Sequence, residues 1–359
     1  MLIPSFYPLI GGSETQVLLL SKALIELGVK VFVVTRKIDS CTKINDCIEG
    51  VLVKRLVYIC KPYTFSISSL VWLIINHRNY DLIFIHTLDS PSLTACICKM
   101  ILNKPIIIKI RGGGLEIGLL KKPLGSVRWR ILRKYTDKFV ALTSIAAKEL
   151  MDHGISQDRI IKQPNGVIIP SSSELENHAP KYLAVSVGRI DPIKRPEILL
   201  EVWRMVVDSI PGAILLIIGD GPFYNTLQEK IINLGLNNNI IITGIIQNAD
   251  VKKMLMDSEV FVHCSKSEGM SNAMLEAISH GLPIVCTRFP GVEEVVRHGY
   301  NGFICDPDNI EEIASELIRI LCDNELRGYM GRNSRKISIE KYSIEHIAQH
   351  YKKEFQELL

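Results

Sequence analysis

The sequence predicts an α/β protein in which two domains of alternating strands and helices each hold a parallel sheet. Its 359 residues are enough for two domains of ordinary size, and its 47% hydrophobic and 22% charged residues are typical of a globular chain. The expected strands are continuous runs of Val, Ile and Leu, which indicates sheets covered by helices on both faces. The pattern occurs in both halves, so we expect the carboxyl ends of two sheets to border a ligand cleft.

The first half of the chain alternates between strands and helices. An amphipathic helix is expected directly after the turn at Gly11 and Gly12, where the apolar residues recur at helical spacing. The other elements expected in this half are strands 29–35, 81–87, 105–111 and 138–143 and helices 70–77 and 92–103.

A polar stretch at residues 170–180 separates the two halves. It begins and ends with proline and lacks hydrophobic periodicity, so we interpret it as a linker between domains 1–169 and 181–342. The second half then repeats the alternation. Its expected elements are strands 182–187, 213–218, 239–243, 260–263 and 283–286 and helices 197–209, 224–234 and 251–256.

The start of the sequence is unusual for a domain of this kind. Only Met1, Leu2 and Ile3 precede Pro4, although a loop such as 4–12 ordinarily follows a full strand. Strands are typically about 5–6 residues long. We therefore expect the first strand of this domain to begin before the first residue of the given sequence.

The charge of the chain is unevenly distributed. Residues 1–180 contain 23 Lys and Arg against 14 Asp and Glu, whereas residues 181–359 contain 19 against 24. The basic half is compatible with nucleic acid, anionic lipid or a phosphorylated substrate, and ordinary surface variation is the alternative. Within it, the segment 121–134 places Trp129, Ile131 and Leu132 among basic residues, which fits an anionic membrane surface and a solvated helix on the outer face of the domain equally well.

Several classes of site are not supported by the sequence. The nine cysteines include no Cys-x-x-Cys pair, which suits a reducing compartment. Neither a P-loop, a Gly-x-Ser-x-Gly elbow nor a dinucleotide Gly-x-Gly-x-x-Gly motif occurs. The acids Asp306 and Asp308 fit a turn better than a metal site, and no cluster has zinc spacing. We therefore expect neither a metal nor a cofactor.

Glycine-rich and basic loops are expected at the carboxyl ends of strands. Gly11 and Gly12 allow a ligand to approach the backbone, and the helix that follows offers free amides to an anion. Arg189 and Lys194 follow the strand 182–187, where a guanidinium and an ammonium suit a diphosphate. Each of these features alone is more often a tight turn or a solvated basic loop.

Two glutamates lie on and before a single predicted helix. Glu268 occupies a Gly-Met-Ser-Asn turn, and Glu276 lies on the helix that this turn begins. By spacing alone, a capped surface helix with two solvated acids is the simpler interpretation. His86 and Arg111 end two strands of the first half, so both are expected at the edge of its sheet that faces the cleft.

Taken together, these residues resemble the family 4 glycosyltransferases of the GT-B fold, which has two Rossmann-like domains with parallel sheets facing a central cleft. The resemblance extends from the Gly11-Gly12 loop to the last helix and is strongest over residues 187–305. The motifs that carry it, in chain order, are Gly11-Gly12, Pro164-Asn-Gly-Val167, Gly188-Arg189, Lys194, Gly219-Asp-Gly-Pro222, Glu268-x7-Glu276 and Pro290-Gly-Val-Glu-Glu294.

The resemblance implies a role for each matching residue. Glu268 would face the hydroxyls of the donor sugar, Glu276 would hold the ribose of the nucleotide, and Arg189 and Lys194 would bind its diphosphate. His86 would lie beside the sugar. The residues implied in donor binding are Gly11, Gly12, Gly188, Gly219, Gly221, Gly269, Met270, Ser271, Asn272 and Glu276.

The acceptor side is implied less specifically, with Arg111 and Asn165 as candidates in domain 1–169. Residues 343–359 would form a helix that packs back on that domain. The function implied is a retaining, metal-independent transfer of a hexose or N-acetylhexosamine from a nucleotide-diphosphate sugar to a glycan or lipid-linked acceptor. Such chemistry would build lipopolysaccharide or capsule at the cytoplasmic face of the membrane, without nucleic acid as a partner. The alternatives are a nucleotide-sugar epimerase and a non-catalytic nucleotide- or glycan-binding protein.

Overall fold

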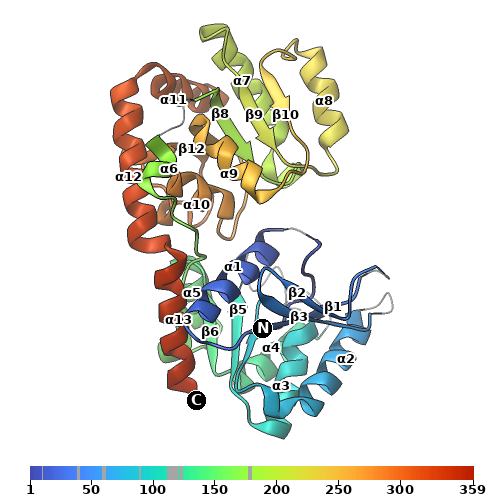
Figure 1. Cartoon of the computed structure of the whole chain (residues 1–359). Helices are drawn as coiled ribbons and strands as arrows, with labels where there is room; N and C mark the ends of the chain where they lie inside the picture. Colours follow the sequence, from blue (N-terminus) through green and yellow to red (C-terminus); the bar gives the residue numbers. More distant parts are fainter. Residues whose placement is uncertain are drawn as a thin grey trace. The chain divides into compact units, whose positions relative to one another are not determined.

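The computed structural model describes residues 1–9, 11–38, 41–58, 62–88, 90–110, 120, 124–176 and 180–359. The chain divides into two compact units: unit 1 comprises Met1–Gly166 and Ile344–Leu359, and unit 2 comprises Val167–Ser343. Each unit holds a sheet that is largely or wholly parallel, with helices on both faces (Figure 1). The predicted α/β class with two Rossmann-like halves is therefore confirmed. No helix in the described part of the chain is long and apolar enough to cross a membrane.

The sheet of unit 1 is joined at its centre by the first three residues. Leu2 pairs in parallel with Val34 on one side and with Ile85 on the other, and its amide donates to Phe84 at 2.8 Å. The strand order is therefore β2-β3-β1, then residues 1–3, then β4-β5-β6-β7. The strands are β1 (Phe32–Arg36), β2 (Asn45–Ile48), β3 (Val51–Leu56), β4 (Ile83–Ile85), β5 (Ile106–Ile110), β6 (Lys138–Ala141) and β7 (Ile160–Lys162).

The helices of unit 1 form two layers. Helices α2 (Pro62–Ile75), α3 (Ser90–Leu102), α4 (Gly125–Tyr135) and α5 (Ser144–Asp152) place buried residues in one core with β4 and β5. On the other face, α1 (Gly12–Glu26) packs against α13 (Ile344–Leu358) (Figure 1). The C-terminal helix is thus an integral part of the unit formed by the start of the chain.

The sheet of unit 2 is parallel throughout, in the order β10-β9-β8-β11-β12-β13. Its strands are β8 (Tyr182–Val187), β9 (Leu215–Ile218), β10 (Ile240–Ile242), β11 (Ser258–His263), β12 (Ile284–Thr287) and β13 (Gly302–Cys305). Its longer helices are α7 (Pro196–Ser209), α8 (Tyr224–Asn233), α9 (Asn248–Met256), α10 (Asn272–Ser279), α11 (Ile310–Cys322) and α12 (Asn324–Tyr342). Helices α7, α8 and α11 cover one face of the sheet, and α9, α10 and α12 cover the other.

Some sequence-based expectations differ from the structure. The helix expected at 70–77 begins at Pro62, because Phe65 and Leu73 fall on the face that packs in the core. The antiparallel hairpin of β2 and β3 was not expected. The stretch 170–180 lies in unit 2 and contains a short helix, α6 (Ser172–Glu176), while the division between the units follows Gly166. Trp129 and Leu132 face the core and are buried, so they cannot insert into a membrane.

Candidate functional site

The candidate site of unit 2 lies at the centre of its sheet, where β8 has β9 on one side and β11 on the other. From β8 the chain first adds strands on one side (β9, β10) and then on the other (β11, β12, β13), so β8 and β11 flank a topological switch point. Open α/β sheets bind ligands at such switch points, beyond the carboxyl ends of their strands. β8 ends at Val187, directly before Gly188 and Arg189, and β11 ends at His263, shortly before Glu268. The topology therefore brings together loops that lie far apart in the sequence.

Asp191 shapes the loop that follows β8. Its Oδ1 accepts hydrogen bonds from the backbone amides of Ile193 and Lys194, at 3.0 and 3.2 Å, and so caps a short 3₁₀ helix, η4 (Pro192–Lys194). Its Oδ2 lies 3.8 Å from Nε of Arg189, whose side chain is exposed. One acid therefore contacts the backbone of Lys194 and lies beside the guanidinium of Arg189, the two basic residues that the sequence singled out.

Two glycines after β9, Gly219 and Gly221, allow the loop that follows β9 to pack against the loop that follows β8. A Cβ on Gly219 would lie 1.9 Å from the carbonyl oxygen of Gly188, and a Cβ on Gly221 would lie 2.2 Å from that of Ile190. Both of these oxygens belong to the backbone, so neither can move aside by a change of side-chain rotamer. The amide of Gly188 in turn donates to the carbonyl of Ile218 at 3.0 Å, which fixes the distance between the two loops.

The loop after β11 is tied to the same structure. The amide of Lys266 donates to the carbonyl of Ile193 at 2.8 Å, and the hydroxyl of Ser265 donates to that carbonyl at 3.2 Å. Thr287, at the end of β12, donates its hydroxyl to the carbonyl of Ser265 at 2.7 Å. The segment that carries Glu268 is thus held next to the turn that carries Lys194.

Lys194, Glu268 and His263 form a three-membered cluster at this point. The ammonium of Lys194 pairs with Oε1 of Glu268, and Nε2 of His263 lies 3.1 Å from the same oxygen. His263 is buried between the rings of Phe261 and Phe289, whereas Lys194 and Glu268 are only partly buried. The cluster was not predicted, since the sequence analysis assigned Lys194 to the diphosphate and Glu268 to the sugar.

The protonation of the cluster follows from its surroundings. Burial raises the pKa of Glu268, but the hydrogen bond from His263 and the charge of Lys194 outweigh it and lower this pKa to about 2. Burial lowers the pKa of His263, against the opposing effect of its hydrogen bond to Glu268. At neutral pH the carboxylate can only accept, so the neutral imidazole carries its proton on Nε2 and donates it to Glu268.

Helix α10 presents the second acid in a different environment. The hydroxyl of Ser271 accepts from the amide of Met274 at 3.4 Å and caps the helix, which begins at Asn272. Gly269 and Met270 form the turn before it. Burial raises the pKa of Glu276 to about 7, although the charge of Lys252 opposes the increase. The two glutamates that the sequence singled out therefore differ strongly in proton affinity.

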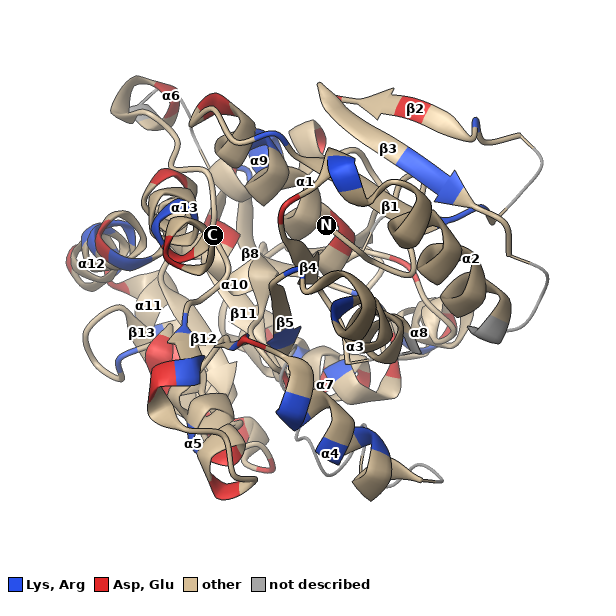
Figure 2. Ribbon diagram, turned by 90° about the horizontal axis from the view of Figure 1, so that it is seen from below, with Lys and Arg blue, Asp and Glu red and all other residues tan. Residues whose placement is uncertain are grey.

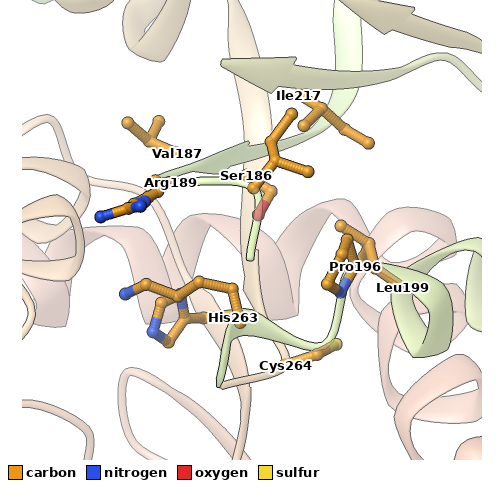
Figure 3. A pocket seen from close by; sticks show the side chains of 11 residues that line it. Ser186, Val187, Arg189, Pro196, Leu199, Ile217, His263 and Cys264 are labelled. Atoms are coloured by element: carbon orange, nitrogen blue, oxygen red, sulfur yellow. The ribbon is translucent and has the colours of Figure 1, made fainter. Parts of the chain in front are cut away.

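A small pocket opens beside the β8 loop (Figure 3). Arg189 and His263 lie along one side of it, and Ile217, Pro196 and Leu199 line the other. The other lining residues are Ser186, Val187, Gly188, Ile190, Lys194 and Cys264. In the described part of the chain, no cluster of His, Cys, Asp or Glu could hold a metal ion.

Unit 1 places three of the predicted residues at the carboxyl edge of its own sheet. Gly11 and Gly12 begin α1 after the segment 1–3, and His86 directly follows β4. His86 is buried against Phe84, at a ring distance of 4.3 Å. The loop before α1 is held by Arg55, a buried residue of β3 that donates to the carbonyl of Tyr7 at 2.7 Å.

The two acceptor-side candidates have different outcomes. Arg111 lies outside the residues that the structure describes. Asn165 is buried, and its Oδ1 accepts a hydrogen bond at 2.7 Å from the ammonium of Lys109. Lys109 belongs to β5, where every residue is buried.

Sequence reasoning missed His263, Lys109 and Asp191. For His263 a signal existed, because it ends a predicted strand just as His86 does and precedes Glu268 by five residues. A lysine inside the apolar run 105–111 was a comparable signal for Lys109. Asp191 resembles any loop acid, and only its hydrogen bonds distinguish it.

Comparison with known proteins identifies the chain as a glycosyltransferase. The family model described as "Glycosyltransferase Family 4" matches residues 10–169, and the model "Glycosyl transferases group 1" matches residues 170–337. The chain belongs to the family 4 glycosyltransferases of the GT-B fold.

Relatives with assigned activities align over three quarters of the chain or more. The N-acetyl-alpha-D-glucosaminyl L-malate synthase of Bacillus anthracis is 23% identical over 98% of this chain and 96% of its own length. The 2-deoxystreptamine N-acetyl-D-glucosaminyltransferase of Niallia circulans is 24% identical over 92% of this chain and 94% of its own. The UDP-Gal:alpha-D-GlcNAc-diphosphoundecaprenol alpha-1,3-galactosyltransferase of Escherichia coli is 24% identical over 76% of this chain and 74% of its own.

Solved structures share the fold. HepE of Anabaena, in complex with UDP and glucose, superposes with a TM-score of 0.80 at 18% identity, over 99% of this chain and 98% of its own. The lipopolysaccharide outer core galactosyltransferase WaaB superposes with a TM-score of 0.72 at 18% identity, over 99% of each chain. The family models and the relatives together show that the chain is a glycosyltransferase that uses a nucleotide-sugar donor.

Proposed function

We propose that this enzyme transfers a hexose or N-acetylhexosamine from a nucleotide-diphosphate sugar with retention of anomeric configuration and without a metal ion. The observation that carries the proposal is the meeting of Arg189, Lys194, His263 and Glu268 at the switch point of the unit 2 sheet. The cationic and anionic side chains are held there on the loops that follow β8 and β11.

Arg189 and Lys194 are suited to the leaving group. A departing nucleoside diphosphate develops negative charge, which pre-positioned cations stabilise most effectively because they need not reorganise. An ammonium has three donors, so Lys194 can pair with Glu268 and still donate to a phosphate oxygen. Glu268 offsets the charge of Lys194, and Asp191 lies 3.8 Å from Arg189, so the exposed guanidinium of Arg189 offers the phosphates hydrogen-bond donors more than net charge. These two cations are the basis for proposing that no metal is required.

Glu268 and Glu276 are suited to different parts of the donor. Glu268 stays ionised because its pKa is about 2, so it can accept hydrogen bonds from sugar hydroxyls over the whole neutral range. Glu276 lies on the first turns of α10, and we assign it to the ribose hydroxyls of the nucleotide. Gly12 and His86, in unit 1, keep the roles that the family resemblance implies.

The acceptor we propose is a growing glycan or a lipid-linked precursor, in the synthesis of lipopolysaccharide or capsule at the inner face of the membrane. The relatives support this choice, because they include a galactosyltransferase named for a diphosphoundecaprenol-linked acceptor and a lipopolysaccharide core glycosyltransferase. Asn165 and Arg111 remain the acceptor-side candidates.

A donor screen tests the proposal. Purified protein is incubated with a membrane lipid extract as the source of acceptor and with UDP-glucose, UDP-galactose, UDP-N-acetylglucosamine or GDP-mannose, and released nucleoside diphosphate is measured with and without EDTA. We expect turnover with one donor class, survival in EDTA, and the α-anomer by NMR when the product of an α-linked donor is isolated. Loss of activity in EDTA contradicts metal independence, and isomerised donor without release of nucleoside diphosphate indicates an epimerase.

Substitutions test the site itself. Arg189→Ala and Lys194→Ala should each cost about 2–4 kcal/mol of transition-state stabilisation, because each removes a cation that would stabilise the negative charge of the leaving group. Arg204→Ala is the matched control, since Arg204 is an exposed base on α7 in the same unit. Unchanged kcat/KM in both site variants would show that the diphosphate binds elsewhere.

A further inference from the structure

Two neighbouring helices of unit 1 carry almost no charge. Helix α2 contains no Asp, Glu, Lys or Arg, and α3 contains only Lys99, whose ammonium pairs with Asp137. A helix on the surface of a globular protein normally shows a charged face to water, whereas a helix that is apolar all round is normally buried. In Figure 2 the ribbon of α2 is accordingly tan along its length, apart from residues that are not described.

Both helices nevertheless expose an apolar row. On α2 the row is Ile67, Val71 and Ile75, and its first and last members are 64% and 73% exposed. The opposite side of the helix, with Phe65 and Leu73, is buried in the core. The row has the i, i+4, i+8 spacing of a single helix face.

Helix α3 repeats this arrangement beside α2. Its outer residues Ile97, Met100 and Ile101 are exposed, while Ala95 and Cys98 are buried in the same core as Leu73. The two helices pack against each other and against the same face of the sheet. Their apolar rows therefore belong to one outer layer of unit 1, and large exposed apolar surfaces mark sites of interaction.

The next helix of the layer, α4, supplies positive charge. It packs against α3 and contains four basic residues and no acid. Arg130, Arg133 and Lys134 are exposed, as are the aliphatic residues Leu124 and Val127, whereas Trp129 points inward. Figure 2 shows the blue segments gathered on α4. The apolar surface is thus flanked by exposed basic residues.

We propose that the outer surface of α2, α3 and α4, here called the α2–α4 face, docks onto the interface of an anionic lipid bilayer. The exposed Ile, Val, Met and Leu side chains would enter the boundary between headgroups and acyl chains, and Arg130, Arg133 and Lys134 would meet anionic headgroups. The chemistry favours lipid over a protein partner. Protein interfaces are enriched in aromatic residues and carry polar groups that give hydrogen bonds, whereas the exposed rows here are aliphatic.

This inference goes beyond the proposed sugar transfer, because it depends only on unit 1 and not on the donor site. It assigns the basic half of the chain to lipid through α4, which lies largely in the segment 121–134 that the sequence singled out, and through the apolar rows of α2 and α3, which were not predicted. The aliphatic rows give the attachment its apolar part, and α4 gives it selectivity for anionic membranes. Two such signals together are what stable attachment at an interface requires.

Flotation with liposomes tests the inference on the full-length protein. Vesicles of phosphatidylcholine alone and vesicles that also contain phosphatidylglycerol are compared at low and high salt. We expect flotation with the anionic vesicles at low salt and partial release at high salt, because salt screens the contribution of α4 but not the apolar contribution. The partition coefficient should fall about tenfold or more for Ile67→Glu, and about fivefold for Arg130→Glu.

Matched controls come from unit 2. Ile232→Glu changes an isoleucine of α8 that is 63% exposed, against 64% for Ile67, and Arg204→Glu reverses an exposed base of α7. Neither control should alter flotation, and circular dichroism should show that all four variants fold. The inference is overturned if wild-type protein ignores anionic vesicles, or if Ile67→Glu and Ile232→Glu behave alike. It is also overturned if light scattering shows a dimer that only Ile67→Glu dissociates, since the face then binds a second copy.

Discussion

Glu268 and Glu276 lie eight residues apart but bind protons with very different strength. The pKa of Glu268 is lowered to about 2, because His263 and Lys194 stabilise its charge against the effect of burial. The pKa of Glu276 is raised to about 7, because burial outweighs the opposing charge of Lys252. At neutral pH one acid is fully ionised and the other is about half protonated. This difference gives the two residues separable signatures.

We predict that nucleotide affinity rises with pH through the pKa of Glu276. An ionised carboxylate can accept hydrogen bonds from both ribose hydroxyls, so UDP measured by calorimetry should bind about tenfold more tightly at about pH 8 than at about pH 6. For stability the sign is opposite. The folded state holds the proton of Glu276 more strongly than the unfolded chain, so this contribution is fully present below about pH 4.5 and is lost as pH rises through about 7.

Glu276→Gln is the control, because it keeps the shape of the side chain and removes its titration. This variant should bind UDP weakly. Its affinity should change with pH only through the terminal phosphate of the nucleotide, which titrates at about pH 6. It should also unfold at no lower temperature than the wild type at about pH 8, since it removes a charge that burial disfavours. A wild-type affinity that changes no more with pH than that of the variant would rule out a ribose role for Glu276.

At His263 we predict an effect on turnover and none on nucleotide binding. His263→Leu removes a hydrogen bond that orients the Glu268 carboxylate, and kcat should fall about tenfold, the cost of roughly one buried hydrogen bond to a charge. His263→Gln retains an N–H donor and should recover much of that loss. The test is kcat in both variants together with the Kd of UDP. If Gln and Leu lower kcat equally, or if both weaken UDP binding, the histidine supports the fold only.

At the scale of elements, the site depends on how closely the ends of β8 and β9 approach. Gly219 has a φ of +147°, and a Cβ there would lie 1.9 Å from the carbonyl oxygen of Gly188. We predict that Gly219→Ala lowers the free energy of unfolding by about 1–3 kcal/mol and also lowers kcat, because the β8 loop must shift. Chemical denaturation and steady-state kinetics measure the two effects.

Gly212 provides the matched substitution. It precedes β9, has no positive φ, and a Cβ there would meet nothing within 4 Å. Gly212→Ala should therefore leave stability unchanged or raise it slightly by restricting the unfolded chain. Equal effects of the two substitutions would mean that the loops are not held as closely as described.

At the scale of the whole molecule, the chain passes between the units twice, at Gly166–Val167 and at Ser343–Ile344. Gln16 of α1 binds the first crossing with both ends of its amide, to the carbonyl of Gly166 at 2.8 Å and to its amide at 3.1 Å. The helix that begins at the Gly11-Gly12 turn is therefore attached to the point where the chain leaves unit 1.

Helix α13 follows the second crossing and completes the core of unit 1. Ile347 is buried there among Leu20, Leu24 and Tyr351. We predict that Ile347→Ala costs about 2–5 kcal/mol of stability, the usual cost of a large-to-small change in a core. Lys353→Ala, at an exposed position of the same helix, should cost little. Thermal unfolding of both variants decides whether the last helix is structural, and equal unfolding temperatures would contradict it.

The sequence by itself determined the α/β class, the alternation of elements in each half, and the candidate loops at the ends of the strands. These features are local: an apolar run of Val and Ile, or a glycine beside a strand end, carries its signal within a few residues. Hydrophobic periodicity also indicated the helix after Gly12. The turn and helix of residues 268–276 were identified in the same way.

Only the tertiary structure decided which residues meet. Lys194, His263 and Glu268 come together because β8 and β11 are neighbours, and strand order is set by packing across the whole sheet. Burial is a property of the fold in the same sense: it directs Trp129 into the core, leaves Ile67 and Met100 outside, and separates the proton affinities of Glu268 and Glu276. Local sequence determines which elements form, whereas burial and long-range strand pairing determine the protonation state and the contacts of each side chain.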